Sequence, residues 1–319
     1  MICNAGCEIS IIICTRNRAK DLVQTLTSFQ GLYVPNGLQC ELVIVDNASE
    51  DGTAKIVQEF QPPYLPTRYI YEPRLGKGHA YNAATASARG KVLLFTDDDV
   101  RLPANWIEGM SSPILLGHAD ALAGGVKIAS HLQRPWMRQL HREWLASTDY
   151  IDCNNPQAMV GANMAFSRDV LSKVPLFDTE LGPGALGFSD ETLFCWQLQE
   201  AGYKIGSALE TIVEHHFDPV RLSRSSFIST ATKLGRSTAY LLHHWEHKVV
   251  DNAGRHLAEI TARAACQNLK RWKSSPSSEG LQEWEMYQTV KMHTYKQYLI
   301  ERRRPRNYEL RGLVKKSCW

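Results

Sequence analysis

None of the eight cysteines of this 319-residue chain forms a CxxC motif with another. A structural zinc site usually draws its four ligands from two such pairs, and Cys3 and Cys7 have no second pair to complete one. The cysteines are instead scattered along the chain, as is typical of free thiols in a reducing compartment.

Long apolar runs are also missing. No uninterrupted apolar segment approaches the roughly 18 to 20 residues that a helix needs to cross a bilayer. The first residues, MICNAGCEISIIIC, carry no basic residue ahead of the apolar run, so we interpret residues 9–13 as a buried strand rather than a signal peptide. The sequence shows no low-complexity tract and no repeat. We therefore expect a cytoplasmic globular protein.

The charges are unevenly distributed. Residues 1–220 carry 17 basic and 25 acidic side chains, whereas residues 221–319 carry 19 basic and 8 acidic ones. The overall charge of +3 conceals this asymmetry. An acidic first part and a basic second part indicate two regions with different partners.

Alternating strand and helix patterns predict an α/β fold with a mostly parallel central sheet and helices on both faces. The expected strands are 8–14, 39–45, 67–71, 91–96, 121–128, 159–166 and 203–216. The expected helices are 17–29, 54–60, 78–88, 105–115, 168–174 and 189–201. Residues 131–152 lack a clean periodicity and predict a loop or a broken helix. From residue 223 the pattern is helical, with a linker at 274–280.

Three of the predicted strands end in unusually polar residues. These are Thr15-Arg16-Asn17, Asp46-Asn47 and Asp97-Asp98-Asp99. Each has an ordinary explanation by itself, because Thr15 is a suitable helix cap and Asp-Asn is a common turn. In an open α/β sheet, however, ligands bind outside the carboxyl ends of the strands. Three polar ends on one edge of one sheet therefore predict a binding site.

The three adjacent aspartates indicate a cation. Neighbouring carboxylates repel each other unless they are solvated, protonated or neutralised, and oxygen ligands suit Mg²⁺ or Mn²⁺, which also bridge to substrate phosphates. The alternative is a solvated turn before Pro103. Lys77 and His79 lie in RLGKGHAYNAA, which is not a Walker A loop, but which brings a cation and backbone N–H groups within reach of an anion.

The order and spacing of five segments resemble the family 2 glycosyltransferases of GT-A fold. The segments are ISIIICTRNRAKDLVQTLTSF, ELVIVDNASEDGT, RLGKGHAYNAATASARGKVLLFTDDD, VGANMAFSRDVL and FSDETLFCWQLQEAGYKI. The resemblance covers residues 8–217, about two-thirds of the chain. It implies a GT-A domain over 1–220, with a nucleotide-sugar half at about 1–100 and an acceptor half at about 101–220. Residues 221–319 then form a basic, mainly helical extension.

The resemblance also implies roles for individual residues in binding the nucleotide-sugar donor. Thr15 and Arg16 would border the base and ribose, with Asn17 beside them, and Asp46 would accept a hydrogen bond from the base. The remaining donor-site positions are Asn47 and Ser49 as supporting turn residues, Lys77 and Asn82 in the nucleotide or phosphate pocket, Asp97 on the ribose or sugar side, and Asp98, which would help Asp99 to hold the metal.

The metal ion and the catalytic base follow from the same resemblance. Asp99 would hold Mn²⁺ or Mg²⁺ through a DXD-type motif, and His215, or alternatively His216, would complete the metal shell. The segment FSDETLF matches an acidic segment of the family and places Asp190 on the catalytic Asp, with Glu191 as the alternative if the register slips by one. First-turn acids that complement a helix dipole are the ordinary explanation for both.

The function that the resemblance implies is an inverting, metal-dependent transfer of a sugar from a nucleoside-diphosphate donor, with a UDP-sugar favoured. The acceptor would be a hydroxyl of a glycan or a lipid-linked saccharide. Two alternatives stay open: a nucleotidyltransferase acting on a sugar phosphate, and a nucleotide-sugar-binding protein without turnover.

The basic region after residue 220 favours an anionic partner. Seven of its cations follow Glu301, namely Arg302, Arg303, Arg304, Arg306, Arg311, Lys315 and Lys316. An anionic membrane surface attracts such a segment at about 1 kcal/mol per nearby cation. No nucleic-acid-binding motif accompanies the charge. Our hypothesis is peripheral contact with the inner face of the membrane, and the alternative is a solvated helical face.

Overall fold

A computed structural model describes residues 7–271 and 278–316 of the chain. Within them, one eight-stranded sheet has the strand order β3-β2-β1-β4-β7-β6-β8-β5. The strands are β1 (Ile9–Thr15), β2 (Cys40–Asp46), β3 (Thr67–Tyr71), β4 (Val92–Thr96), β5 (Val100–Arg101), β6 (Ala121–Ile128), β7 (Asn163–Ser167) and β8 (Ile205–His215).

The sheet is mixed rather than uniformly parallel. Strands β1 to β4 are parallel to one another, as are β6 and β8. Strand β7 runs antiparallel to both β4 and β6, and β5 runs antiparallel to β8. Because β1, β2 and β4 are parallel neighbours, their carboxyl ends lie on the same edge of the sheet, as the sequence predicted.

Helices cover both faces of the sheet, because successive strand residues point to opposite sides. Ile11 of β1 packs in a core with α1 (Ala19–Phe29), α2 (Thr53–Glu59) and α4 (Trp106–Leu115). The next residue, Ile12, packs in a second core that contains α3 (Lys77–Ser87) and α6 (Asp190–Glu200). The fully buried strands explain the near-continuous apolar runs in the sequence.

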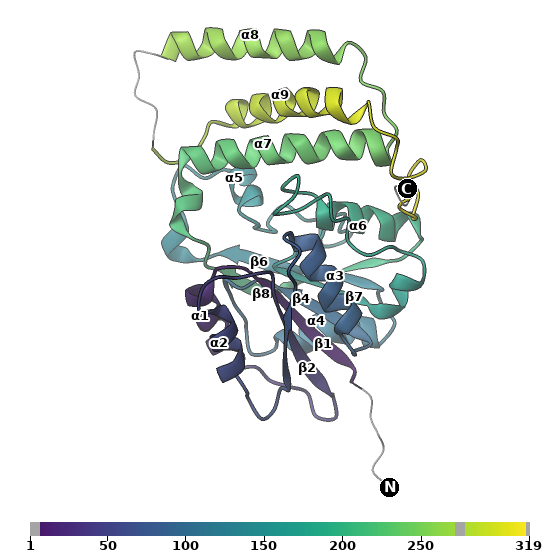
Figure 1. Ribbon diagram of the computed structural model, residues 1–319. Coiled ribbons are helices and arrows are strands. Elements are labelled where there is room, and N and C mark those ends of the chain that lie inside the picture. The colour runs from purple at the N-terminus through teal and green to yellow at the C-terminus, as the bar shows by residue number, and fades with distance from the viewer. Residues whose placement is uncertain (1–6, 272–277, 317–319) are drawn as a thin grey trace.

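The helices after residue 220 lie above the sheet in Figure 1, with α7 (Arg224–Tyr240) next to it and then α9 (Glu283–Glu301) and α8 (Ala253–Arg271). A turn of π-helix, Leu241–Trp245, extends α7. Phe227 of α7 and Met286 of α9 share one core with Trp144 of the short helix α5 (Gln139–Trp144). The basic region is therefore packed against the rest of the molecule.

Most predicted elements appear within two residues of their expected bounds, and 67–71 and 121–128 match fully. The strand expected at 159–166 begins only at Asn163, because residues 159–162 turn toward the start of α3. The helix expected at 168–174 is the 3₁₀ helix Arg168–Ser172. Residues 131–152 contain only short helices, as expected. Most of the linker predicted at 274–280 lies outside the described residues.

The described cysteines, which exclude Cys3 and Cys318, are all free thiols. No helix within the described ranges is long and apolar enough to span a membrane.

Candidate active site

The carboxyl ends of β1 and β4 meet through a direct hydrogen bond. The Thr15 hydroxyl donates to Asp98 Oδ2 at 2.6 Å, although the two residues are 83 positions apart. Both side chains are buried. Thr15 therefore positions a carboxylate of the aspartate cluster.

Arg18 is the main contact of that cluster, and the sequence analysis missed its role. Its guanidinium Nη1 lies 3.1 Å from Asp98 Oδ1, and its Nη2 lies 2.8 Å from Asp99 Oδ2. The Arg18 side chain is 31% exposed, whereas those of Asp98 and Asp99 are 6% and 2% exposed. One fork-shaped cation thus pairs with two buried carboxylates. The sequence did contain a signal for this pairing, because a basic residue follows a strand end by three positions in a chain with three clustered acids.

His215 faces the other side of Asp99. Its Nε2 lies 3.3 Å from Asp99 Oδ1, and its Nδ1 lies 2.9 Å from the carbonyl oxygen of Leu145. A carbonyl only accepts, so Nδ1 carries a proton and Nε2 is the ring nitrogen that faces Asp99. The ring of His216 instead contacts Glu214, with Nε2 2.9 Å from Oε2. Of the two histidines, His215 is the one beside Asp99.

The two buried aspartates differ in their preferred protonation state. Burial raises the pKa of Asp98 to about 7, against the opposing effect of the Arg18 charge. Burial would raise the pKa of Asp99 too, but His215 and then the Arg18 and Arg221 charges hold it below its usual range. Asp99 is therefore the carboxylate that is ionised throughout the neutral range.

Asp99 and His215 have the donor atoms that a divalent cation requires. Arg18 and His215 face the two Asp99 oxygens as ion-pair contacts that lack hydrogen-bond geometry, so both oxygens keep lone pairs for a cation. The Nδ1–H bond to Leu145 fixes His215 in the way that metal-bound imidazoles usually are. No group of three or more His, Cys, Asp or Glu side chains within residues 7–271 and 278–316 is arranged to hold a metal. The pair therefore fits a cation that takes its remaining ligands from water and substrate phosphate.

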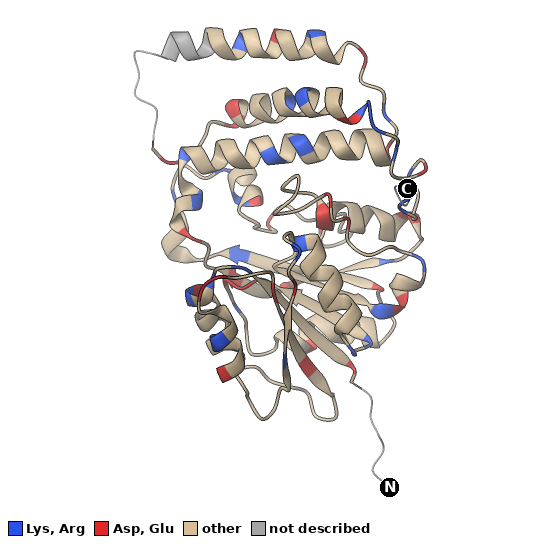
Figure 2. Cartoon of the chain, viewed as in Figure 1, with Lys and Arg blue, Asp and Glu red and all other residues tan. Residues whose placement is uncertain are grey.

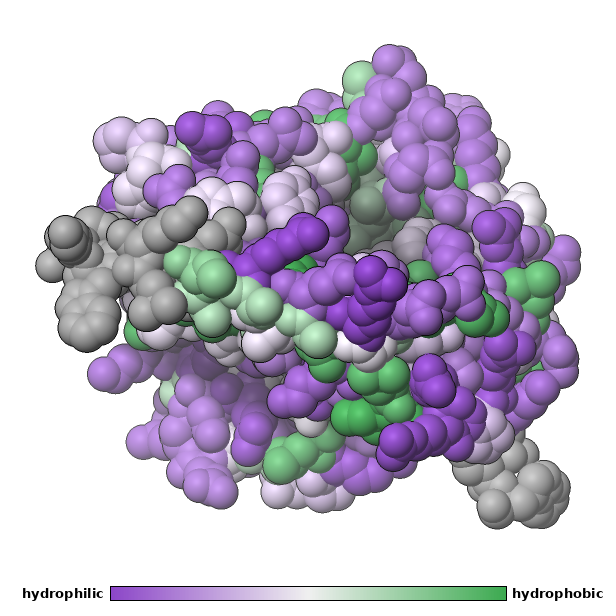
Figure 3. All heavy atoms as spheres, turned by 90° about the horizontal axis from the view of Figure 1, so that it is seen from above, coloured by the Kyte–Doolittle hydropathy of each residue, from purple (hydrophilic) through white to green (hydrophobic). Residues whose placement is uncertain are grey.

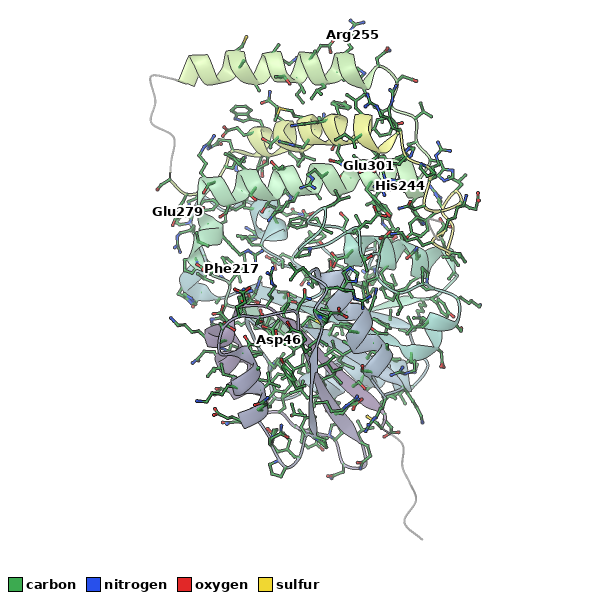
Figure 4. All side chains as sticks on the ribbon, in the orientation of Figure 1. Asp46, Phe217, His244, Arg255, Glu279 and Glu301 are labelled. Carbon is green, nitrogen blue, oxygen red and sulfur yellow. The ribbon has the colours of Figure 1, made fainter. Side chains whose placement is uncertain are left out.

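Arg221 is a second cation that sequence reasoning did not place at the site. It lies in the 3₁₀ helix Pro219–Leu222, with its guanidinium carbon 5.1 Å from the centroid of the Phe217 ring. It is close enough to Asp99 to lower the pKa of that carboxyl. Figure 4 shows Phe217 near the edge of the sheet that bears Asp46, below α7. Nothing local in the sequence distinguishes Arg221 from the other basic residues that follow it.

Asp46 and Asn47 build the turn after β2. Asp46 Oδ1 accepts from the Ser49 N–H at 2.8 Å, and its Oδ2 accepts from the Tyr69 hydroxyl at 2.8 Å. The Asn47 amide donates to the carbonyl oxygens of Glu72 and Arg74, and its Oδ1 accepts from the Gly76 N–H. Asn47 therefore ties the end of β2 to the start of α3. The predicted contact of Asp46 with a base stays a prediction.

The loop after β1 is tied to the same turn. Asn17 has a positive φ of 53°, its N–H donates to Ser49 Oγ at 2.9 Å, and its Oδ1 accepts from the Glu50 N–H at 2.7 Å. Arg16 is exposed beside it. These bonds hold Arg18 in place at the residue before α1, where it reaches the aspartates.

Lys77 joins the two predicted halves of the site. Its Nζ lies 3.4 Å from Asp97 Oδ1 and 2.9 Å from Glu191 Oε1. In Figure 2 the blue start of α3 lies beside the red start of α6. Burial would raise the pKa of Glu191, but the Lys77 ammonium and a hydrogen bond with Asp190 lower it to about 2. Glu191 is therefore ionised at neutral pH.

The pKa of Asp190 is shifted in the opposite direction from that of Glu191. It is 1% exposed, and Gly182, with a positive φ of 77°, packs directly against its carboxyl group. Its Oδ2 has no hydrogen-bond partner among the described residues. Burial, and then the Glu191 charge, raise the pKa of Asp190 well above its usual value. Asp190 therefore holds a proton more tightly than Glu191 does.

The side chain of Asn82 forms hydrogen bonds with the backbone of Phe177. Its Nδ2 donates to the carbonyl oxygen of Phe177 at 2.9 Å, and its Oδ1 accepts from the Phe177 N–H at 2.9 Å. The nitrogen and the oxygen of its side-chain amide thus both hold the segment that leads to Gly182. A contact of Asn82 with nucleotide stays a prediction.

Comparison with known families identifies the family of the chain. A family model described as "Glycosyl transferase family 2" matches residues 10–174, just over half of the chain. The chain belongs to glycosyl transferase family 2. The match begins in β1 and includes Arg18, Lys77 and the three aspartates, and it ends before α6.

Curated relatives of this family 2 chain match over shorter segments. The glycosyltransferase AglE of Haloferax volcanii is 28% identical over 120 residues, which are 37% of this chain and 39% of AglE. The succinoglycan biosynthesis protein ExoM of Rhizobium meliloti is 26% identical over 137 residues, which are 42% of this chain and 44% of ExoM. The chain thus spans less than half the length of either relative.

Solved structures show the same fold over more of the chain. The mannosyltransferase PcManGT of Pyrobaculum calidifontis, in complex with GDP-Man and Mn²⁺, has a TM-score of 0.62 at 18% identity and covers 92% of this chain and 86% of its own. GalNAc-T7, with UDP, GalNAc and Mn²⁺, has a TM-score of 0.54 at 15% identity and covers 75% and 48%. These likenesses confirm the predicted GT-A fold of this family 2 chain.

Proposed function

We propose that this chain is an inverting, divalent-metal-dependent glycosyltransferase that uses a nucleoside-diphosphate sugar and an acceptor hydroxyl. One observation carries the proposal. A metal-competent pair, Asp99 and His215, and an ionised carboxylate, Glu191, lie at one edge of the sheet, linked through Lys77 and Asp97. Family membership and the Mn²⁺ in the complexes of PcManGT and GalNAc-T7 support it.

Of the two candidate bases, the geometry favours Glu191 over Asp190. A general base has to be ionised and within reach of the acceptor. The Glu191 side chain is 17% exposed and ionised, whereas Asp190 is buried and its pKa is strongly raised. We assign Asp190 to holding Glu191 in place through their mutual hydrogen bond.

These groups account for the proton and for the bonds that form and break in the transfer step. The acceptor oxygen attacks the anomeric carbon and gives its proton to Glu191, while the carbon–oxygen bond to the diphosphate breaks and its electron pair leaves with the phosphate. Asp99 and His215 would hold the divalent cation, which would stabilise the negative charge on the departing diphosphate. Lys77 adds a fixed positive charge. A diphosphate that attracts Lys77 also weakens its pairing with Glu191 and so makes Glu191 a stronger base.

The decisive experiment measures donor binding and turnover with the full chain. UDP, GDP and dTDP are screened by thermal shift with Mn²⁺, with Mg²⁺ and with a chelator, and matching sugar donors are then incubated with Mn²⁺. We expect a nucleoside diphosphate to raise the Tm only when a divalent cation is present, and the corresponding donor to release sugar and nucleoside diphosphate. Asp99→Asn is expected to abolish the metal-dependent shift.

The same assays, repeated with a nucleoside triphosphate and a sugar phosphate, separate the two alternative functions. Release of pyrophosphate from a nucleoside triphosphate would replace the proposal with a nucleotidyltransferase. Binding without turnover of any donor would indicate a nucleotide-sugar-binding protein. For the nucleoside of the donor we propose uridine, which the family resemblance favours. The GDP-Man bound by PcManGT makes GDP the necessary comparison.

For the acceptor we propose a saccharide or a lipid-linked saccharide, with peripheral contact to an anionic membrane. Within the described chain no ion pair engages Arg302, Arg303 or Arg306. Arg302 and Arg306 line a cavity of about 300 Å³ together with Asn252 and with Val249, which is 71% exposed. The face seen from above is mostly hydrophilic, with apolar groups scattered over it, so we expect an electrostatic contact (Figure 3).

Other cations of the same segment have partners inside the protein. Four of them pair with carboxylates: Arg304 with Glu180, Arg311 with Glu200, Lys315 with Asp178, and Lys316 with Glu309. The membrane proposal therefore depends on fewer charges than the sequence indicated. Cosedimentation with phosphatidylserine vesicles at low salt tests it. Binding by wild type that falls in Arg302→Gln/Arg306→Gln supports it, and no binding by wild type overturns it.

A further inference from the structure

The Arg18 guanidinium occupies the position of a counter-ion for the aspartate cluster. It contacts Asp98 and Asp99 through two separate nitrogens, and its Nε lies 3.1 Å from Asp21 Oδ2. The planar guanidinium thus spreads one positive charge over two carboxylates, with a separate nitrogen facing each of them. In the free protein the cluster is therefore neutralised by a residue of the chain itself.

Arg18 also contacts the same carboxylate that faces His215. Arg18 Nη2 lies 2.8 Å from Asp99 Oδ2, and His215 Nε2 lies 3.3 Å from Asp99 Oδ1. The arginine is the most exposed member of the group, so it lies on the solvent side of the carboxylates. A cation that ligates Asp99 has to share this carboxylate with Arg18 or displace its guanidinium.

Electrostatics makes sharing unfavourable. A divalent cation and a guanidinium on one carboxylate repel each other, and Arg221 already adds a positive charge nearby. Without Arg18 and without a metal, however, two buried carboxylates would have lost their principal cation. The negative charge of the two carboxylates is therefore neutralised either by Arg18 or by a metal ion, and Arg221 contributes a positive charge in both cases.

We propose that Arg18 and the divalent cation compete for Asp99, and that the guanidinium released by metal binding pairs with the diphosphate of the donor. This inference rests on the proposed function, since it takes Asp99 as a metal ligand. It makes Arg18 a positioning residue that couples the two ligands. The metal ion alone binds weakly because it has to displace Arg18, and it binds more tightly once an anionic diphosphate receives the guanidinium.

The test measures Mn²⁺ binding by electron paramagnetic resonance and calorimetry, with and without UDP or GDP. In wild type we expect the nucleotide to tighten Mn²⁺ binding at least 10-fold. In Arg18→Gln we expect Mn²⁺ alone to bind at least 10-fold more tightly than in wild type, and the effect of the nucleotide to shrink to a few-fold. The same variant is expected to bind the nucleotide less tightly at saturating Mn²⁺.

Lys20→Gln is the matched control, because Lys20 is an exposed cation two residues further along the chain. It changes the net charge equally and is expected to leave Mn²⁺ affinity unchanged. Arg18→Lys retains the charge but replaces the fork with a single ammonium group, so an intermediate Mn²⁺ affinity is expected. It also serves as the test variant if Arg18→Gln does not fold.

The outcomes distinguish this inference from the proposed function. If wild type binds Mn²⁺ together with nucleotide, but Arg18→Gln and Arg18→Lys bind Mn²⁺ alone no better than Lys20→Gln, the competition is refuted and the proposed function stands. If Mn²⁺ binds to none of these proteins, even with nucleotide, the metal-dependent function fails as well.

Discussion

The Nζ atom of Lys77 lies 2.9 Å from Oε1 of Glu191, although the two residues are 114 positions apart in the sequence. Lys77 is the first residue of α3, and Glu191 is in the first turn of α6. The contact joins the aspartate cluster to the candidate base, because Lys77 also faces Asp97. The first two predictions concern this contact.

We predict that Glu191→Gln lowers the rate of sugar transfer by about 10²-fold or more, the usual contribution of a general base. Asp190→Asn is expected to retain most of the activity, since the raised pKa of Asp190 favours its neutral form and asparagine has nearly the same shape. Steady-state kinetics on both variants, with nucleotide binding as the measure of an intact donor site, provides the check. The opposite ranking of the two variants would assign the base to Asp190.

Gly161→Ala is predicted to separate Lys77 from Glu191 without changing any charge. A Cβ atom at Gly161 would press on Glu191 Oε1 and would lie 2.5 Å from the Tyr81 hydroxyl and 2.8 Å from Lys77 Nζ. The Glu191 and Lys77 atoms are ends of flexible side chains and can move apart, whereas the buried Tyr81 ring has to shift within the core. We expect the transfer rate to fall about 10-fold and the Tm to fall as well, with the chain still folded. Gly254→Ala, where a Cβ meets no atom within 4 Å, is the control and should leave transfer intact.

Lys315→Met is predicted to destabilise the protein by about 1–3 kcal/mol, because it removes the cation that faces the buried carboxylate of Asp178. Asp178 would keep the hydrogen bonds that it accepts from the Tyr240 and Tyr308 hydroxyls, each at 2.6 Å, and from the Glu180 N–H at 2.9 Å, but no cation would face it. Denaturant unfolding measures the effect. Lys316→Met is the matched control, since its partner Glu309 is 76% exposed, and surface pairs of this kind contribute about 0–1 kcal/mol. Equal losses in the two variants would contradict the structural role of Lys315.

Glu301 is predicted to make folding stability depend on pH in the acidic range. Burial would raise its pKa, but a hydrogen bond from His244 and the pairing with Arg304 lower it to about 2, from an ordinary value of 4.5. Figure 4 shows Glu301 and His244 close together at the ends of α9 and of the α7 extension. Because the pKa is lower in the folded state, the stabilisation is complete above about pH 4.5 and disappears as the pH falls toward 2.

The difference in unfolding free energy between wild type and Glu301→Gln isolates this contribution. It is expected to be on the order of 2–3 kcal/mol at neutral pH and to decrease steadily from pH 4.5 to pH 2. A difference that stays constant over this range would show that the Glu301 charge has no part in it.

Much of the sheet and the location of the site were predictable from local patterns. Buried strands appear as continuous apolar runs, and residues 67–71 and 121–128 were expected with their observed bounds. The polar ends of β1, β2 and β4 indicated a binding edge, because parallel strands bring their carboxyl ends together. The metal-competent residue Asp99 followed from this reasoning and from the family resemblance.

The partners of these side chains could not be predicted in the same way. Arg18 pairs with aspartates 80 and 81 positions away, and Arg221 reaches the cluster from a segment that reads as part of the basic tail. Likewise, Lys315 appears in the sequence as a surface charge but pairs with the buried Asp178. A charge pattern records how many ions a segment carries and not which of them the fold brings into contact.

The amino-acid sequence by itself determined the α/β architecture, the family and the strand edge that bears the acids, because periodicity and strand ends are properties of adjacent residues. Only the tertiary structure decided that the pKa of Glu191 is lowered while that of Asp190 is raised, that His215 rather than His216 faces Asp99, and that Arg18 pairs with the cluster. These properties depend on burial and on distances between residues far apart in the chain, and both are set by the packing of the sheet against α3, α6 and the loop before α1.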